Sequence, residues 1–434
     1  DGDRSLDLVT ADKEAKGVSV LLSRRNVGFL AAVSYPTGNG PSSVASGDLP
    51  SSPAVHVLKA GSGDEGTAML EIVNDLAPGS PLAFYAPTSS TDMVAGIRAL
   101  RDAGSKVIVD DITFLDEPKF EDGPIALEAR AFYTGGGVYV TSAGNSAGSH
   151  YSHAYVQMAG PGGDYPFAHD YGSGDIGNTF SVPNGGSLTT ILHWNNKWGL
   201  SGDDFDIFLI RSSDGTPLTA GTNTQDGNDS PFEGLSWTNN TGSAVTVYLA
   251  VFQYRLVSPV SSIVLDYNVY SRSGLVYQYT EPAGSVIGHS AVSEVLSTAT
   301  SNAAIPDTIA PYSSRGPGKV YFPSVEERQT PNITGIDGVS NRTGQLGFFS
   351  NPFYGTSAAA PHLGAIAALV WQANPSLTSN GVRTAILGTA LDRGTAGWDA
   401  TWGLGRVDAY QAVASVISVP PSVATNAADN VTTT

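Results

Sequence analysis

The stretch YGTSAAAPHLGAIAALV (residues 354–370) joins a tight turn to a long apolar segment. Gly355 allows the turn, Ser357 follows at the start of a predicted helix, and the three alanines after it permit close packing. A helix N-terminus offers unpaired N–H groups and the positive end of the helix dipole, which stabilise a developing oxyanion. The stretch therefore predicts a nucleophilic serine, although Gly-Thr-Ser alone is far more often an ordinary N-cap.

Composition narrows the class of protein. The chain has 434 residues, of which 41% are hydrophobic and 14% charged, so we expect a globular protein with two domains or one large domain with an insertion. A net charge of −18 argues against nucleic acid and anionic membranes as partners. The absence of cysteine excludes disulfides and thiolate metal sites.

The cellular location is also an expectation from the sequence. The chain begins with Asp1 rather than Met, and it contains no apolar run near the roughly 18 residues of a membrane span. Together with the lack of cysteine, this predicts a secreted, extracellular protein from which an N-terminal segment has been removed.

The first part of the chain alternates between strand and helix patterns. Such alternation predicts an α/β fold with a parallel sheet covered by helices on both faces. In these sheets, ligands bind at the carboxyl ends of the strands, where Asp110, Asp111 and Asn145 fall. The expected strands are 17–22, 81–87, 106–112 and 137–145, and the expected helices are 65–80, 91–104 and 123–136.

The pattern changes after about residue 150. Short alternating strands punctuated by Gly, Asn and Asp replace the helical period, which predicts an inserted antiparallel β-sandwich. Strand and helix patterns then return and end in a Pro/Thr-rich tail. The expected domains are 1–155 and 281–418 for the two parts of the α/β unit, 156–280 for the insertion and 419–434 for the tail.

Several segments resemble motifs of subtilisin-like serine peptidases, in family order. GTSAAAPH (355–362) resembles the nucleophile motif, and VTSAGNSAG (140–148) resembles the strand that ends in the oxyanion-hole asparagine. YSSRGP (312–317), TPNITGIDGVS (330–340) and GLGRVDA (403–409) resemble further signatures. The resemblance implies a three-layer parallel-sheet fold and hydrolysis of peptide bonds, with Ser357 as nucleophile and Asn145 as oxyanion donor.

The rest of the expected triad is missing. The resemblance implies an aspartate after the first core strand, expected here at 17–22, but Ser23 or Arg24 occupies that position. It also implies a histidine before the helix GTAMLEIV, where Glu65 stands instead. The chain has seven histidines, but His289 and His362 are expected to pack or cap within the fold and the others lie in loops or the insertion.

Carboxylate chemistry is the remaining route to an active serine. The sedolisins, which are similar in fold, use a glutamate in place of the histidine base. By analogy Glu65 is the expected base and Asp111 its partner, with Asp110 as the alternative and Asp64 and Glu71 as weaker candidates. Two such carboxyls should share one proton, which predicts activity at acidic pH.

Two functions remain open from the sequence. The first is a secreted serine-carboxyl endopeptidase that acts on peptides or proteins. The second is an inactive pseudopeptidase that serves as a binding, surface or filament-assembly scaffold through self-association. The insertion carries DDFDIFLIRSSDGTPLTAG (203–221), which resembles the prepeptidase C-terminal type of β-sandwich; its Asp204 and Asp206 could serve turns or bind calcium.

Overall fold

The computed structural model describes residues 55–417 and, before them, only the backbone of short strands. Strands β1 (Leu8–Asp12), β2 (Gly17–Leu21) and β5 (Val33–Pro36) form an antiparallel sheet, and β3 (Ser23–Arg24) pairs with β4 (Gly28–Phe29). The expectation that 17–22 opens the parallel core sheet is therefore wrong. An apolar β-branched run predicts a strand but not the strand it pairs with, and here the nearest chain neighbours pair with it. The side chain of Ser23 lies outside the described residues.

A parallel sheet forms the centre of the α/β unit. Its strand order is β23-β20-β9-β8, and every neighbouring pair is parallel. Apolar residues on both faces fit strands that are covered on both sides. The strands are β8 (Val107–Asp110), β9 (Val138–Ser142), β20 (Leu296–Asn302) and β23 (Ile333–Asp337), and β6 (His56–Lys59) and β7 (Ala83–Tyr85) make a second parallel pair.

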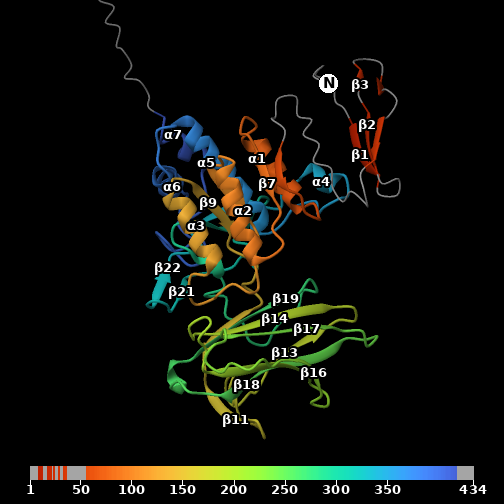
Figure 1. Ribbon diagram of the computed structural model, residues 1–434, viewed down its shortest axis with the longest axis vertical. Helices are drawn as coiled ribbons and strands as arrows, with labels where there is room; N and C mark the ends of the chain where they lie inside the picture. The colour runs from red at the N-terminus through yellow and green to blue at the C-terminus, as the bar shows by residue number, and fades with distance from the viewer. Residues whose placement is uncertain are drawn as a thin grey trace, which may run out of the picture.

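Helices cover both faces of the central sheet (Figure 1), as the alternation predicts. On one face Ile97 and Phe132 from α2 (Ser90–Asp102) and α3 (Pro124–Thr134) pack against Ile108 and Tyr139. The other face is covered by the C-terminal helices. These are α5 (Thr356–Ala373), α6 (Ser379–Gly388) and α7 (Ala409–Ala414), while α1 (Glu65–Leu76) packs beside α5 and the short α4 (Arg342–Gln345) lies next to α1.

Two antiparallel sheets between β9 and β20 form the expected inserted β-sandwich, drawn in yellow and green in Figure 1. Trp194, Phe205 and Tyr267 are fully buried in the core between them. One sheet has the order β10-β19-β14-β17, comprising β10 (His150–Ala154), β14 (Ser187–Trp194), β17 (Phe232–Thr238) and β19 (Val264–Tyr270). The other contains β11 (Gln157–Gly162), β12 (Tyr165–His169), β13 (Asn178–Val182), β15 (Asp204–Arg211), β16 (Pro217–Gly221) and β18 (Val245–Arg255).

Two short strands complete the α/β unit: β21 (Gly318–Val320) pairs antiparallel with β22 (Glu326–Arg328). None of the helices within residues 55–417 is long and apolar enough to cross a membrane.

Candidate active site

Ser357 lies in the first turn of α5, and 9% of its surface is exposed to solvent. The preceding Gly355 has φ +104°, a left-handed conformation that favours glycine, and its N–H donates to the Asp337 carboxylate over 2.8 Å. Asp337 is the last residue of β23, so the turn before the helix is attached to the central sheet. This arrangement places Ser357 at the N-terminus of α5, at the positive end of the helix dipole.

The Asn145 side chain is held next to that turn. Its Oδ1 accepts hydrogen bonds from the Thr356 backbone N–H over 3.0 Å and from the Thr356 hydroxyl over 3.1 Å. Gly144 N–H in turn donates to the Thr356 hydroxyl over 3.2 Å. With Oδ1 occupied, the Nδ2 group of this exposed side chain keeps its two N–H donors for other partners.

Asp111 follows β8 and meets Ser357 across the top of the sheet. Its carboxyl lies close enough to the Ser357 hydroxyl and to the Glu65 carboxyl for both groups to shift its pKa. Burial raises the pKa of Asp111 well above its usual range, and the charge of Glu65 raises it further, while Ser357 partly offsets both effects. A carboxyl with a raised pKa is a stronger base once it has lost its proton.

Close packing of α5 against β8 brings these two groups together. Gly364 lies on α5, where a Cβ atom would be only 2.2 Å from Cγ2 of Val109. The absence of a side chain at Gly364 therefore lets the helix approach the strand that ends just before Asp111.

Glu65 is the first residue of α1, and its side chain is exposed. Both Glu65 and Ser357 act on the Asp111 carboxyl, so these three groups lie near one another. The expectation that Glu65 takes the serine proton, with Asp111 as its partner, stays a prediction.

The subtilase family matches residues 60–405, which is most of the chain. The chain belongs to the subtilase family. An extracellular serine protease of Serratia marcescens is 32% identical over 108 residues, which are 24% of this chain and 10% of that protein. The chain thus spans about a tenth of the curated relative it matches.

The CspB protease of Clostridium perfringens is similar in structure, with a TM-score of 0.51 and 14% identity over 77% of this chain and 73% of that one. Sphericase aligns with a TM-score of 0.36 and 14% identity, over 76% and 68% of the two chains. At this identity the first of these likenesses shows the fold alone.

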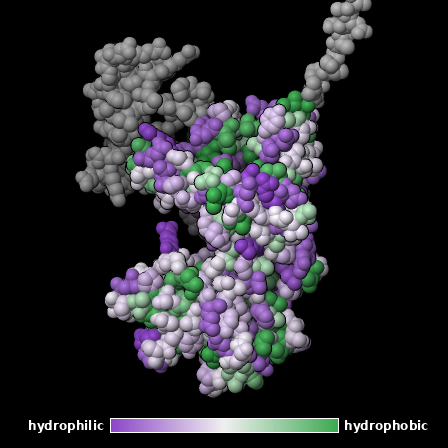
Figure 2. Space-filling model, turned by 180° about the vertical axis from the view of Figure 1, so that it is seen from behind, coloured by the Kyte–Doolittle hydropathy of each residue, from purple (hydrophilic) through white to green (hydrophobic). Residues whose placement is uncertain are grey.

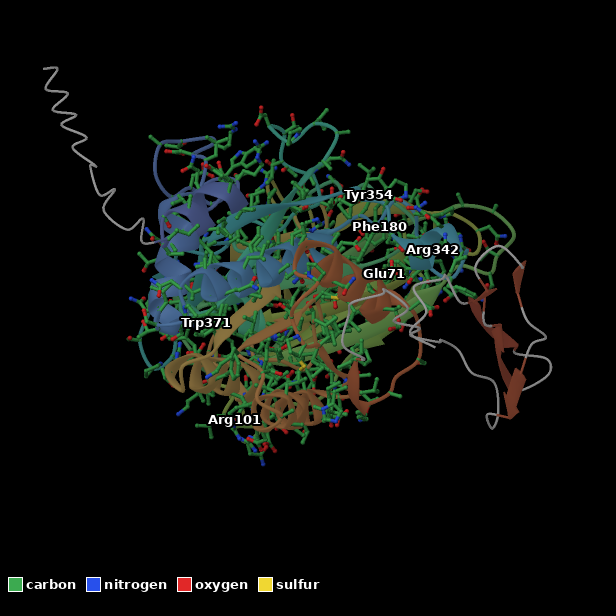
Figure 3. All side chains as sticks on the ribbon, turned by 90° about the horizontal axis from the view of Figure 1, so that it is seen from above. Glu71, Arg101, Phe180, Arg342, Tyr354 and Trp371 are labelled. Atoms are coloured by element: carbon green, nitrogen blue, oxygen red, sulfur yellow. The ribbon has the colours of Figure 1, made fainter. Side chains whose placement is uncertain are left out.

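The other acidic candidates of this subtilase have different partners. Asp110 accepts a hydrogen bond from the Thr141 hydroxyl over 2.8 Å, and Asp64 is the N-cap residue of α1. Glu71 accepts from the backbone N–H groups of Arg342 and Thr343 over 2.7 and 3.0 Å. Figure 3 shows Glu71 and Arg342 as neighbours. Glu71 therefore accepts hydrogen bonds from backbone N–H groups at the N-terminus of α4, which have no partner within the helix.

One histidine, His289, contacts Asp110, the residue before Asp111. His289 is 1% exposed, with Nδ1 2.9 Å from the Glu117 carboxylate and Nε2 3.0 Å from Asp110. Burial alone would lower the pKa of His289, but the charges of Glu117 and Asp110 raise it well above its usual range. Sequence reasoning missed this network beneath Asp111, because its members are separated by up to 179 residues. His362 instead bonds the carbonyl of Ala358 over 2.7 Å.

Strand β6, which precedes α1 in the chain, ends in a positively charged residue. β6 runs parallel to β7 and ends at Lys59, which forms an ion pair with Asp92. The Tyr85 hydroxyl also donates to Asp92, over 2.7 Å. This strand thus ends in an ammonium group that is already paired.

A cleft of about 750 Å³ lies between the α/β unit and the sandwich. Figure 2, seen from behind, shows the surface hollowed between these two parts. Asp111 and Asn145 both line it, so two of the candidate catalytic groups face a space of the size of a ligand site.

Within residues 55–417, no cluster of three or more histidine or acidic side chains is arranged to hold a metal ion. Asp206 accepts a hydrogen bond from Tyr165 over 2.6 Å, and Asp204 accepts one from the backbone of Gln225 over 3.1 Å. Both aspartates considered for calcium thus bind groups of the protein.

Proposed function

We propose that this subtilase is a serine-carboxyl endopeptidase with Ser357 as nucleophile and Asp111 as general base. The observation that carries the proposal is the position of Asp111, which lines the cleft together with Asn145 and lies close to Ser357 and Glu65, where its pKa is raised. Glu65 would keep that pKa high through its charge, and so would act on Asp111 rather than on the substrate.

The reaction would proceed by acyl transfer. As the Ser357 oxygen bonds to the peptide carbonyl carbon, its proton passes to Asp111, and the carbonyl oxygen becomes an oxyanion. Asn145 Nδ2 and the N–H of Ser357 would donate to that oxygen. Asp111 then gives its proton to the departing amine as the C–N bond breaks, and water cleaves the acyl-enzyme by the same steps.

The expected substrates and setting follow from the family and the relative. Membership in the subtilase family supports a peptide or protein substrate. The Serratia marcescens relative is named an extracellular serine protease, which supports action outside the cell for this chain as well. The resemblance of the insertion to prepeptidase C-terminal sandwiches supports a role for it in binding.

The second candidate is a binding scaffold without turnover, including one that self-associates. Two observations favour it. His289 and His362 are bonded to other groups and do not serve as the base. In addition, β6 ends in Lys59 and not in an aspartate. In that case the turn at Ser357 would be preserved for its shape and not for its chemistry.

Hydrolysis of an unstructured protein, measured from pH 3 to pH 8, distinguishes the two. Ser357→Ala should abolish turnover, whereas Ser212→Ala, an exposed serine of the sandwich, should leave it unchanged. Turnover that persists in Ser357→Ala, or its absence from the unmodified protein at every pH, would overturn the peptidase assignment.

A further inference from the structure

The inserted sandwich contributes one wall of the cleft that Asp111 and Asn145 line. The two walls come from segments far apart in the sequence. From the α/β unit they include Asp111, Gly144, Asn145 and Ser146, and from the sandwich Thr189, Ser236, Trp237, Thr238, Tyr270 and Arg272. A peptide bound in this cleft would therefore lie against the ends of β14, β17 and β19.

A buried ionic cluster fixes the sandwich to the α/β unit. Lys119, between β8 and α3, lies 3.1 Å from Asp266 of β19, and Nε2 of His150 lies 2.9 Å from the same carboxylate. Their side chains are 3%, 2% and 0% exposed. Breaking a buried ion pair leaves an uncompensated charge, so this contact resists separation of the two units.

A second contact acts in the same place. The Glu121 carboxylate accepts a hydrogen bond from the backbone N–H of Trp198 over 2.6 Å. Glu121 belongs to the α/β unit and Trp198 to the loop after β14. The sandwich wall is thus held in place before a substrate arrives, and preorganisation of this kind reduces the cost of binding.

The sandwich side of the cleft carries a positive charge and no negative one. Arg272 is the cation in the lining of the cleft, Asp111 is the charged residue on the opposite wall, and the remaining lining residues are uncharged. Arg272 is exposed, and within residues 55–417 no carboxylate forms an ion pair with it. An exposed guanidinium beside a peptide-sized cleft fits a carboxylate by paired hydrogen bonds.

Its surroundings suit an extended peptide. The Thr189 and Ser236 hydroxyls bond each other over 2.8 Å across β14 and β17. Hydroxyls can bond a peptide backbone.

We propose that the sandwich is a substrate-recognition wall, on which Arg272 binds a carboxylate of the peptide, either an acidic side chain or the C-terminus. This inference builds on the proposed function, because it places the recognised group in the same cleft as the scissile bond. It makes the enzyme selective for peptides that carry such a carboxylate within a few residues of the cleaved bond.

The test compares matched peptides and matched arginine variants. One peptide series replaces each Glu by Gln, and a second replaces the free C-terminus by an amide. Arg272→Gln should raise KM about tenfold for the carboxylate-bearing peptides, spare the neutral ones and leave kcat unchanged. Arg211→Gln, a sandwich arginine paired with Asp214, is the control and should change neither. The series that loses its preference in Arg272→Gln identifies the source of the carboxylate.

Equal losses on neutral and acidic peptides, or a preference unaffected by Arg272→Gln, would overturn the recognition role. Binding of labelled peptides to Ser357→Ala separates this inference from the proposed function. If the unmodified protein hydrolyses nothing but Ser357→Ala binds acidic peptides through Arg272, the peptidase assignment fails and the recognition wall stands. If neither hydrolysis nor Arg272-dependent binding occurs, both fail.

Discussion

At the residue scale, the proposed acyl transfer depends on which carboxyl accepts the proton of the Ser357 hydroxyl. The sequence motif places Ser357 and Asn145, because each follows a recognisable strand or turn signal. It also brings Asp111 and Glu65 into consideration, through their positions at a strand end and a helix start. The buried network of His289 was not predictable, since it joins residues that are distant in the chain.

Asp111→Asn should stabilise the folded protein at neutral pH. Because the pKa of Asp111 is raised in the folded state, the carboxyl destabilises that state as pH rises from the unfolded value near 4 through the folded value. Urea unfolding at pH 3 should give nearly equal stabilities for variant and parent. At pH 7 the variant should gain about 1.4 kcal/mol for each unit of the shift. A constant difference across pH would contradict the raised pKa.

Glu65→Gln should move the acid limb of the pH–rate profile to lower pH. The charge of Glu65 raises the pKa of Asp111, so its removal lets Asp111 lose its proton more readily. The weaker base should also lower the plateau of kcat. Steady-state rates from pH 3 to pH 8 give both quantities, with Glu71→Gln as a control because Glu71 caps α4. An acid limb that stays in place would exclude Glu65 as the partner of Asp111.

His289→Leu should destabilise the protein by about 3–5 kcal/mol, because it leaves the buried carboxylates of Glu117 and Asp110 without a cation. The raised pKa of His289 makes this contribution complete below about pH 6.5, and it is lost as pH rises through the folded value. Urea unfolding at pH 5.5 should detect the loss. Adding Glu117→Gln should restore part of it, and no change in the single variant would contradict an ionic role.

At the scale of elements, the approach of α5 to β8 sets the distance between nucleophile and base. Alternating strand and helix patterns predicted the central parallel sheet, and turn-punctuated strands predicted the sandwich. The pairing of β2 was not predictable, because an apolar run fits an antiparallel hairpin as well as a parallel core strand. The role of Gly364 was also hidden, since a glycine inside a helix pattern does not reveal what lies opposite.

Gly364→Ala should push α5 away from β8, because its Cβ would lie 2.2 Å from Val109. Overpacking of this kind costs about 1–3 kcal/mol, and a small displacement of Ser357 from Asp111 should lower kcat more than it raises KM. The double variant Gly364→Ala/Val109→Ala removes the clash and should recover much of both losses. Equal activity in the single variant and the parent would argue against this close contact as the determinant of the site.

At the scale of the whole molecule, the cleft is lined by two units, the α/β unit and the inserted sandwich. The α/β unit is itself built from two segments that the sandwich separates in the sequence. The sequence predicts both units from their different hydrophobic periods. It does not predict how they dock, because Lys119, Asp266 and His150 are ordinary polar residues until the fold buries them together. The active-site turn therefore belongs to the α/β unit, while the surface that would receive a substrate belongs to both.

The rate at which a fluorophosphonate labels Ser357 tests the central claim most directly, since it reports activation of the hydroxyl without requiring the right peptide. The second-order rate constant should be measured from pH 3 to pH 8 in the unmodified protein, Asp111→Asn and Ser357→Ala. Labelling should depend on Ser357, rise with pH along one acid limb, and fall at least about 100-fold in Asp111→Asn. Labelling of Asp111→Asn at the parent rate, or none in the parent at any pH, would contradict a serine activated by Asp111.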